Sequence, residues 1–158
     1  MSLAAYTGGL INSRFNSPTP QTKIVVENSS PNKAKILLIE DCPFAQKINM
    51  RNLMEMGYEV DLAINGKEGL SMLSKGYDAV ITDINMPEMD GITVIKSIRN
   101  SENNNQLIPI IVLSTETDEI KTQCLNLGAD AAEDKSIKFE NLEQLIKTLL
   151  YKSPKYTR

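Results

Sequence analysis

The chain has 158 residues, of which 41% are hydrophobic and 23% charged, so it can bury the core of one ordinary domain with residues to spare. A net charge of -3 without a run of Lys or Arg excludes the electrostatic footprint of a nucleic-acid-binding domain. The chain contains no histidine, which excludes a histidine base, phosphocarrier or metal ligand within it, and its two separated cysteines are typical of a reduced cytosolic protein.

The first part of the chain is polar and irregular. Residues 1–33 are rich in Ser, Thr, Asn and Pro, so we interpret them as a flexible tail or linker, and the apolar run from Ile24 to Val26 is too short to fold alone. The chain shows neither a signal peptide nor a run approaching the roughly 20 apolar residues that cross a bilayer. We therefore expect a cytoplasmic domain at residues 34–152 that does not contact membranes, followed by a short tail at residues 153–158.

From residue 35 onward, apolar runs alternate with segments of helical period. Strands are predicted at about residues 35–39, 58–62, 78–82, 108–113 and 129–133. Helices are predicted at about residues 43–56, 66–75, 91–100, 117–127 and 139–151. Five alternating strand–helix units predict an α/β fold, in which helices cover both faces of a parallel sheet.

The predicted first helix has clear ends and an irregular middle. Asp41 is interpreted as its N-cap, with Pro43 in the first turn, and Gly57 ends it. Asn49 and Asn52 fall near the centre of its apolar stripe, so its packing against the sheet is expected to be less regular than that of the other helices.

Polar side chains follow four of the predicted strands. Because the carboxyl ends of parallel strands meet at one edge of a sheet, these side chains should lie close together. The set contains three carboxylates, one hydroxyl and one ammonium group, and it would repel itself without a positive ion. A divalent metal together with a phosphoryl group fits it best. The residues are Glu40, Asp41, Asp83, Ser114 and Lys135.

Each of these residues also has an ordinary structural interpretation. Asp41 could simply be the N-cap of a helix, and Asp83 could simply begin a loop. Ser114 could cap the next helix, and Lys135 could be an ordinary surface lysine. The segment from Asp83 is more specific, because it offers a carboxylate, a backbone carbonyl at Asn85 and then a loop fixed by proline. The conjunction at four strand ends favours a functional site.

From about Lys35 to Leu150 the sequence resembles the receiver domain of response regulators in two-component signalling. The segment Asn65–Leu70 is most similar to the receivers of hybrid sensor histidine kinases. The resemblance implies a flavodoxin-like doubly wound (βα)5 fold with a five-stranded parallel sheet in the order 2-1-3-4-5. The matching segments are Ile36–Asp41, Asp83–Gly91, Pro109–Ser114, Gly128–Asp130 and Lys135.

The resemblance also implies a phosphorylation site with magnesium as its cofactor. Asp83 would accept a phosphoryl group, and Asp41, Asp83 and the backbone carbonyl of Asn85 would bind Mg²⁺, with Glu40 acting through water. The resulting acyl phosphate would signal through a conformational switch and be hydrolysed slowly, so this fragment would not otherwise be an enzyme.

The remaining implied roles concern the phosphoryl group and the partners. Ser114 would donate a hydrogen bond to the phosphoryl group and Lys135 would pair with it. Since the chain has no histidine, the phosphohistidine donor would be a separate histidine kinase or phosphotransfer domain, or another part of a parent hybrid histidine kinase. The downstream target is not identified, and the face formed by the fourth helix, fifth strand and fifth helix is a candidate dimer interface.

The sequence departs from the family pattern at five positions. Ser136 follows the lysine where the family has proline, and Ala132 stands where the family has an aromatic residue that rotates on signalling. Glu133 and Asp134 occupy a usually apolar strand end, which predicts a short or shifted strand, and Thr115 replaces a smaller residue.

Two other functions therefore stay open. A degenerate receiver would act only as a protein-interaction module, and the departures from the family pattern keep that alternative alive. An aspartyl phosphohydrolase would be an enzyme of a different class, but such enzymes need a second acid two residues after the nucleophile, where this chain has Asn85.

Overall fold

The structure, a computed structural model, describes residues 33–153, and within them the strands form a five-stranded parallel sheet. The spatial order β2-β1-β3-β4-β5 confirms the predicted order 2-1-3-4-5 and the flavodoxin-like doubly wound fold. The strands are β1 (Lys35–Ile39), β2 (Glu59–Ala63), β3 (Ala79–Thr82), β4 (Ile110–Ser114) and β5 (Ala131–Asp134).

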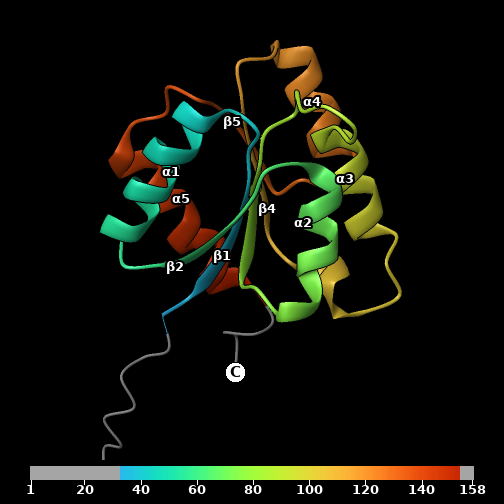
Figure 1. Cartoon of the computed structure of the whole chain (residues 1–158), viewed down its shortest axis with the longest axis horizontal. Helices are drawn as coiled ribbons and strands as arrows, with labels where there is room; N and C mark the ends of the chain where they lie inside the picture. The colour runs from blue at the N-terminus through green and yellow to red at the C-terminus, as the bar shows by residue number, and fades with distance from the viewer. Residues whose placement is uncertain (1–32, 154–158) are drawn as a thin grey trace, which may run out of the picture. The chain divides into compact units, whose positions relative to one another are not determined.

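Helices cover both faces of this sheet (Figure 1). Helices α1 and α5 lie against one face, and α2, α3 and α4 lie against the other. Each predicted element is within about two residues of its place, although the end of the predicted second helix forms the 3-10 helix η1. The helices are α1 (Pro43–Glu55), α2 (Gly66–Met72), η1 (Leu73–Lys75), α3 (Gly91–Arg99), η2 (Asn104–Leu107), α4 (Asp118–Asn126) and α5 (Phe139–Lys152).

The central strands are buried on both faces, which explains why their sequences are continuous apolar runs. In β1, Leu37 and Ile39 pack in the core beneath α2, α3 and α4, while Ile36 and Leu38 pack beneath α1 and α5. Burying one such side chain contributes about 2 kcal/mol. A slip of one residue would exchange the two sets of side chains, so packing fixes the register in which Ile39 lies beside Thr82.

The start of α1 differs from the prediction. Its N-cap is Cys42, not Asp41, because the helix begins at Pro43 and the preceding residue takes the cap position. The interpretation of Asp41 as a capping residue is therefore wrong. The irregular stripe of α1 has the expected consequence, since Leu53 is the buried residue of this helix and Phe44 is 73% exposed.

The predictions for residues 1–33 and 153–158 fall almost entirely outside the described residues, as does the run from Ile24 to Val26. Over residues 33–153, no helix has the length and apolar character that crossing a membrane would require.

Candidate functional site

Asp83 leaves the sheet at the carboxyl end of β3 and is 7% exposed. Its Oδ1 accepts a hydrogen bond from the Ile84 N–H at 2.6 Å, and its Oδ2 accepts one from the Lys135 Nζ at 2.7 Å. The Asp83 N–H donates to the Ile39 carbonyl at 3.1 Å, which ties the residue to β1. A Cβ at Gly91 would lie 2.1 Å from the Asp83 carbonyl oxygen, so the loop that returns past this carboxylate requires glycine.

Glu40 and Asp41 leave the neighbouring strand β1 at the same level. Glu40 is 1% exposed, and its two carboxylate oxygens accept hydrogen bonds from the Cys42 N–H at 3.1 Å and from the Lys135 Nζ at 2.9 Å. Among residues 33–153, the Asp41 carboxylate has no hydrogen bond or ion pair. One oxygen each from Glu40, Asp41 and Asp83 lies within 4.8 Å of the others, which is close enough for a single metal ion to contact all three.

Lys135 provides positive charge that offsets part of the negative charge of these carboxylates. Its side chain is 24% exposed and reaches from the end of β5 to both Glu40 and Asp83. Burial lowers the pKa of the Lys135 ammonium, but hydrogen bonds to Asp83 and Glu40 and the charges of both carboxylates outweigh it, so the pKa is raised. Lys135 is therefore a cation at neutral pH. One ammonium group faces three carboxylates, which leaves net negative charge at the site.

Ser114 and Asn85 complete the predicted set. Both form hydrogen bonds with Glu116, a residue that the sequence did not suggest. Ser114 ends β4, is 1% exposed, and accepts a hydrogen bond from the Glu116 N–H at 3.3 Å. The exposed Asn85 side chain donates a hydrogen bond to the Glu116 carboxylate. Glu116 was missed because it lies in the loop after β4, and a contact between two loops leaves no pattern in the sequence.

The structure thus places all the predicted site residues at the carboxyl edge of the sheet and groups four of them closely there. Ser114 borders this group at the end of β4, and Asn85 follows Asp83 on the loop. These four are Lys135, which contacts Glu40 and Asp83, and the three carboxylates of Glu40, Asp41 and Asp83, which lie within 4.8 Å of one another.

The five departures from the family pattern have clear positions. Thr115 is exposed, and Ala132 is partly buried against the core beneath α4. Strand β5 starts at Ala131, later than predicted, and its last two residues are Glu133 and Asp134. No peptide bond within residues 33–153 is cis, so the bond that precedes Ser136 is trans.

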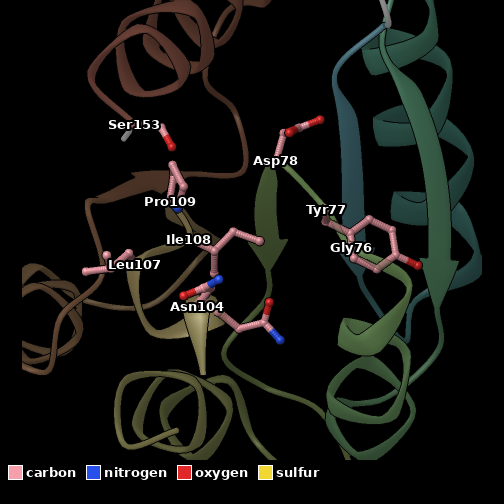
Figure 2. Close-up of a pocket in the computed structure, with 9 residues that line it drawn as sticks. Gly76, Tyr77, Asp78, Asn104, Leu107, Ile108, Pro109 and Ser153 are labelled. Atoms are coloured by element: carbon pink, nitrogen blue, oxygen red, sulfur yellow. The ribbon is translucent and has the colours of Figure 1, made fainter. Parts of the chain in front are cut away.

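A cavity of about 400 Å³ lies at the opposite, amino edge of the sheet (Figure 2). Tyr77 and Asp78 line it just before β3, and Ile108 and Pro109 line it just before β4. None of its lining residues belongs to the carboxylate group, so this cavity is separate from the candidate site.

Comparison with known proteins agrees with this fold. The sequence profile described as "Response regulator receiver domain" matches residues 36–147. The chain is 34% identical over 117 residues to the transcriptional regulatory protein PcoR of Escherichia coli, covering 73% of this chain and 51% of that protein. It is 34% identical over 123 residues to hybrid signal transduction histidine kinase F of Dictyostelium discoideum, covering 75% of this chain and 11% of that protein. The chain therefore spans about half or less of the length of these relatives.

Solved structures with similar folds include a chemotaxis protein and the receiver domain of a sensor histidine kinase. Vibrio cholerae chemotaxis protein CheY4 matches with a TM-score of 0.68 and 31% identity, covering 74% of this chain and 98% of that one. The receiver domain of sensor histidine kinase PA1611 from Pseudomonas aeruginosa matches with a TM-score of 0.69 and 28% identity, covering 75% of this chain and 98% of that one. That crystal structure has a magnesium ion coordinated in its active-site cleft. With its sheet order, its strand-end acids and a profile match across most of the described residues, this chain belongs to the response-regulator receiver domain family of two-component signalling.

Proposed function

We propose that this receiver domain accepts a phosphoryl group on Asp83 from a phosphohistidine donor and changes conformation as a result. The observation that carries the proposal is the position of Asp83. Its carboxylate is nearly buried, lies within 4.8 Å of two other carboxylates, and has the Lys135 ammonium 2.7 Å from Oδ2. A carboxylate used only for structure does not need two further acids beside it.

The phosphoryl transfer is a simple displacement at phosphorus. A carboxylate oxygen of Asp83 forms a bond to phosphorus while the bond from phosphorus to the donor's imidazole nitrogen breaks, and the electron pair of that bond stays on the imidazole. The product is an acyl phosphate. Slow attack by water on phosphorus would release inorganic phosphate and restore the carboxylate, so the signal would be temporary.

Residues of this chain stabilise the charge that develops in this step. The Lys135 ammonium can follow a phosphoryl oxygen because it already contacts the acceptor carboxylate, and a preorganised cation is worth more than one that water must replace. The Ser114 hydroxyl ends the neighbouring strand and would donate a hydrogen bond to another phosphoryl oxygen. Movement of these two groups toward the new charge would shift an existing equilibrium between two conformations.

The donor set also fits Mg²⁺. All its members are oxygens, which suit a hard cation, and the Asp41 carboxylate has no competing partner among the described residues. Asp41, Asp83 and the backbone carbonyl of Asn85 would hold the ion, and Glu40 would assist through water because its carboxylate already accepts two hydrogen bonds. When bound, Mg²⁺ supplies positive charge that offsets the phosphoryl oxygens. The magnesium in the related PA1611 receiver supports this assignment.

Partners and location follow from the same proposal. The donor is a histidine kinase or phosphotransfer domain, which is either a separate protein or part of a parent hybrid kinase, and the domain acts in the cytoplasm without contacting nucleic acid or membrane. A dimer through α4, β5 and α5 stays a prediction. Sedimentation of the protein with and without beryllium fluoride, a phosphoryl mimic, would test it.

Acetyl phosphate with Mg²⁺ tests the phosphorylation site directly, because this small donor needs no partner protein. We expect intact-protein mass spectrometry to show one added phosphoryl group, and Asp83→Asn to abolish it. The matched control is Asp118→Asn, which removes an exposed carboxylate from the first turn of α4 and should label like the parent. Calorimetric titration should show that Asp41→Ala loses Mg²⁺ binding.

The outcomes separate this proposal from its alternatives. Label that persists in Asp83→Asn would overturn the site. A parent protein that binds Mg²⁺ but never takes label would favour a degenerate receiver that acts only in protein interaction. Rapid, continuous release of phosphate from acetyl phosphate would instead favour a phosphohydrolase.

A further inference from the structure

The loop that carries Lys135 is closed by the side chain and backbone of the residue before it. Asp134 is the last residue of β5 and lies beside Ser114 of β4 in the sheet register. Its Oδ1 accepts a hydrogen bond from the Ser136 N–H at 2.8 Å, and its backbone carbonyl accepts one from the Ile137 N–H at 3.0 Å. Together these bonds form an Asx turn within a β-turn, and Lys135 is enclosed by both.

Asp134 also connects this turn to α4. Its other oxygen, Oδ2, lies 3.6 Å from the Lys121 Nζ, and the Lys121 side chain is only 14% exposed. Hydrogen bonds from Ser136 and the charge of Lys121 lower the pKa of Asp134, so the carboxylate is ionised and can hold both partners at neutral pH. The Asp134 side chain therefore connects the end of β5 and the turn that carries Lys135 to helix α4.

This arrangement depends on the residue that follows the lysine. Ser136 has a backbone N–H to donate, whereas a proline at this position, as in the family pattern, would have none. The lysine side chain has several rotatable bonds, so a fixed backbone restricts where its ammonium can go. That ammonium contacts both Asp83 and Glu40 and is the part of the turn that a phosphoryl group would attract.

We propose that Asp134 is a positioning residue for phosphoryl transfer to Asp83: its turn onto Ser136 holds the backbone of Lys135, and its ion pair with Lys121 transmits movement of Lys135 to α4. The inference rests on the proposed phosphorylation of Asp83. It assigns to one polar side chain a link that does not need the aromatic residue absent at Ala132.

The test compares the rate of Asp83 labelling by acetyl phosphate with Mg²⁺ in the parent and in two variants of Asp134. Asp134→Ala removes the acceptor of the turn and should slow labelling about fivefold, the effect of losing one hydrogen bond that positions a reacting group. Asp134→Asn keeps an oxygen that can accept from Ser136 and should restore the parent rate. The matched control is Glu133→Ala, which removes a carboxylate from the adjacent residue without removing a bond of the turn.

Lys121→Met tests the connection to α4, because it keeps most of the side chain and removes only the ammonium. Labelling should proceed at the parent rate, but the backbone amide chemical shifts of α4 should respond to beryllium fluoride less than half as strongly as in the parent. An unchanged response of α4 would refute the proposed connection from Asp134 through Lys121 to α4. An Asp134→Asn variant that labels as slowly as Asp134→Ala would refute the proposed role of the turn in positioning Lys135.

The result for the parent distinguishes this inference from the proposed function. A parent protein that takes no label overturns the proposed function and this inference with it. A parent that labels normally, together with an Asp134→Ala variant that labels at the same rate, overturns this inference alone.

Discussion

Replacing Lys135 by methionine should destabilise the fold more than removing any surface cation, and bound Mg²⁺ should reverse much of the loss. The substitution keeps an unbranched side chain and removes only the ammonium. That group contacts Glu40 at 2.9 Å and Asp83 at 2.7 Å, and the two acid side chains are only 2% and 8% exposed. Without it, two buried carboxylates face each other and Asp41 with no cation nearby.

Breaking a buried ion pair by removing one partner costs about 3 kcal/mol, because the remaining charge is left desolvated and uncompensated. A loss of that size in a domain of this length lowers the melting temperature by roughly 10 °C. Urea denaturation at neutral pH with a chelator present measures the free energy of unfolding. Repeating it with Mg²⁺ should recover more stability in Lys135→Met than in the parent, since the ion binds the folded site and replaces the missing charge.

Lys147→Met is the matched control for this experiment. Lys147 pairs with Glu143 on α5 at 2.7 Å, the same distance as the shorter bond of Lys135, but its side chain is 57% exposed. Its loss should cost less than about 1 kcal/mol. If Lys135→Met were no less stable than Lys147→Met, or if Mg²⁺ stabilised the parent and the variant equally, the reasoning that this site stores uncompensated negative charge would be refuted.

Two further predictions concern the loops on either side of the site. Gly91→Ala places a methyl group 2.1 Å from the Asp83 carbonyl oxygen, so it should lower the free energy of unfolding by about 3 kcal/mol and slow labelling of Asp83; a loss below about 1 kcal/mol in urea denaturation would contradict this. The pKa of Asp134 is lowered below its ordinary 3.8 by Ser136 and Lys121, so its contribution to stability is present above that pH and is lost as the pH falls through the lower folded value. The difference in unfolding free energy between the parent and Asp134→Asn should therefore shrink on acidification, and an NMR titration that placed the Asp134 pKa at or above 3.8 would contradict the cause.

The sequence was most informative where the interior of the protein is most constrained. The strands β1, β3 and β4 are buried on both faces, so each had to be a continuous apolar run, and such runs bounded by polar residues are easily recognised. The same constraint located the site, because any polar residue that follows a buried parallel strand must lie at the carboxyl edge of the sheet. Asp83 and Ser114 could therefore be placed together although 31 residues separate them in the sequence.

The sequence was less informative about the individual contacts that the polar residues of the site make. The spacing of Asp41 and Pro43 suggested a helix cap, and only the structure places the helix start so that Cys42 takes that position. The contact between Asn85 and Glu116 joins two loops, and loop contacts leave no periodic pattern in a sequence. Both outcomes depend on the exact path of the backbone between elements, which hydrophobic patterns do not determine.

The residues around Lys135 illustrate a third case, in which two departures from the family pattern are informative only when they are taken together. An acid in place of an apolar residue at position 134 and a serine in place of proline at position 136 each look like a weakening of the family pattern. In the structure they depend on each other, because the Asp134 carboxylate accepts a hydrogen bond from the Ser136 N–H, which proline does not have. An acid followed by proline would lose that donor, and an apolar residue followed by serine would lose the acceptor. The two departures therefore form one alternative way of closing the turn, and a single departure from a family pattern is weak evidence of degeneration until its neighbours have been considered with it.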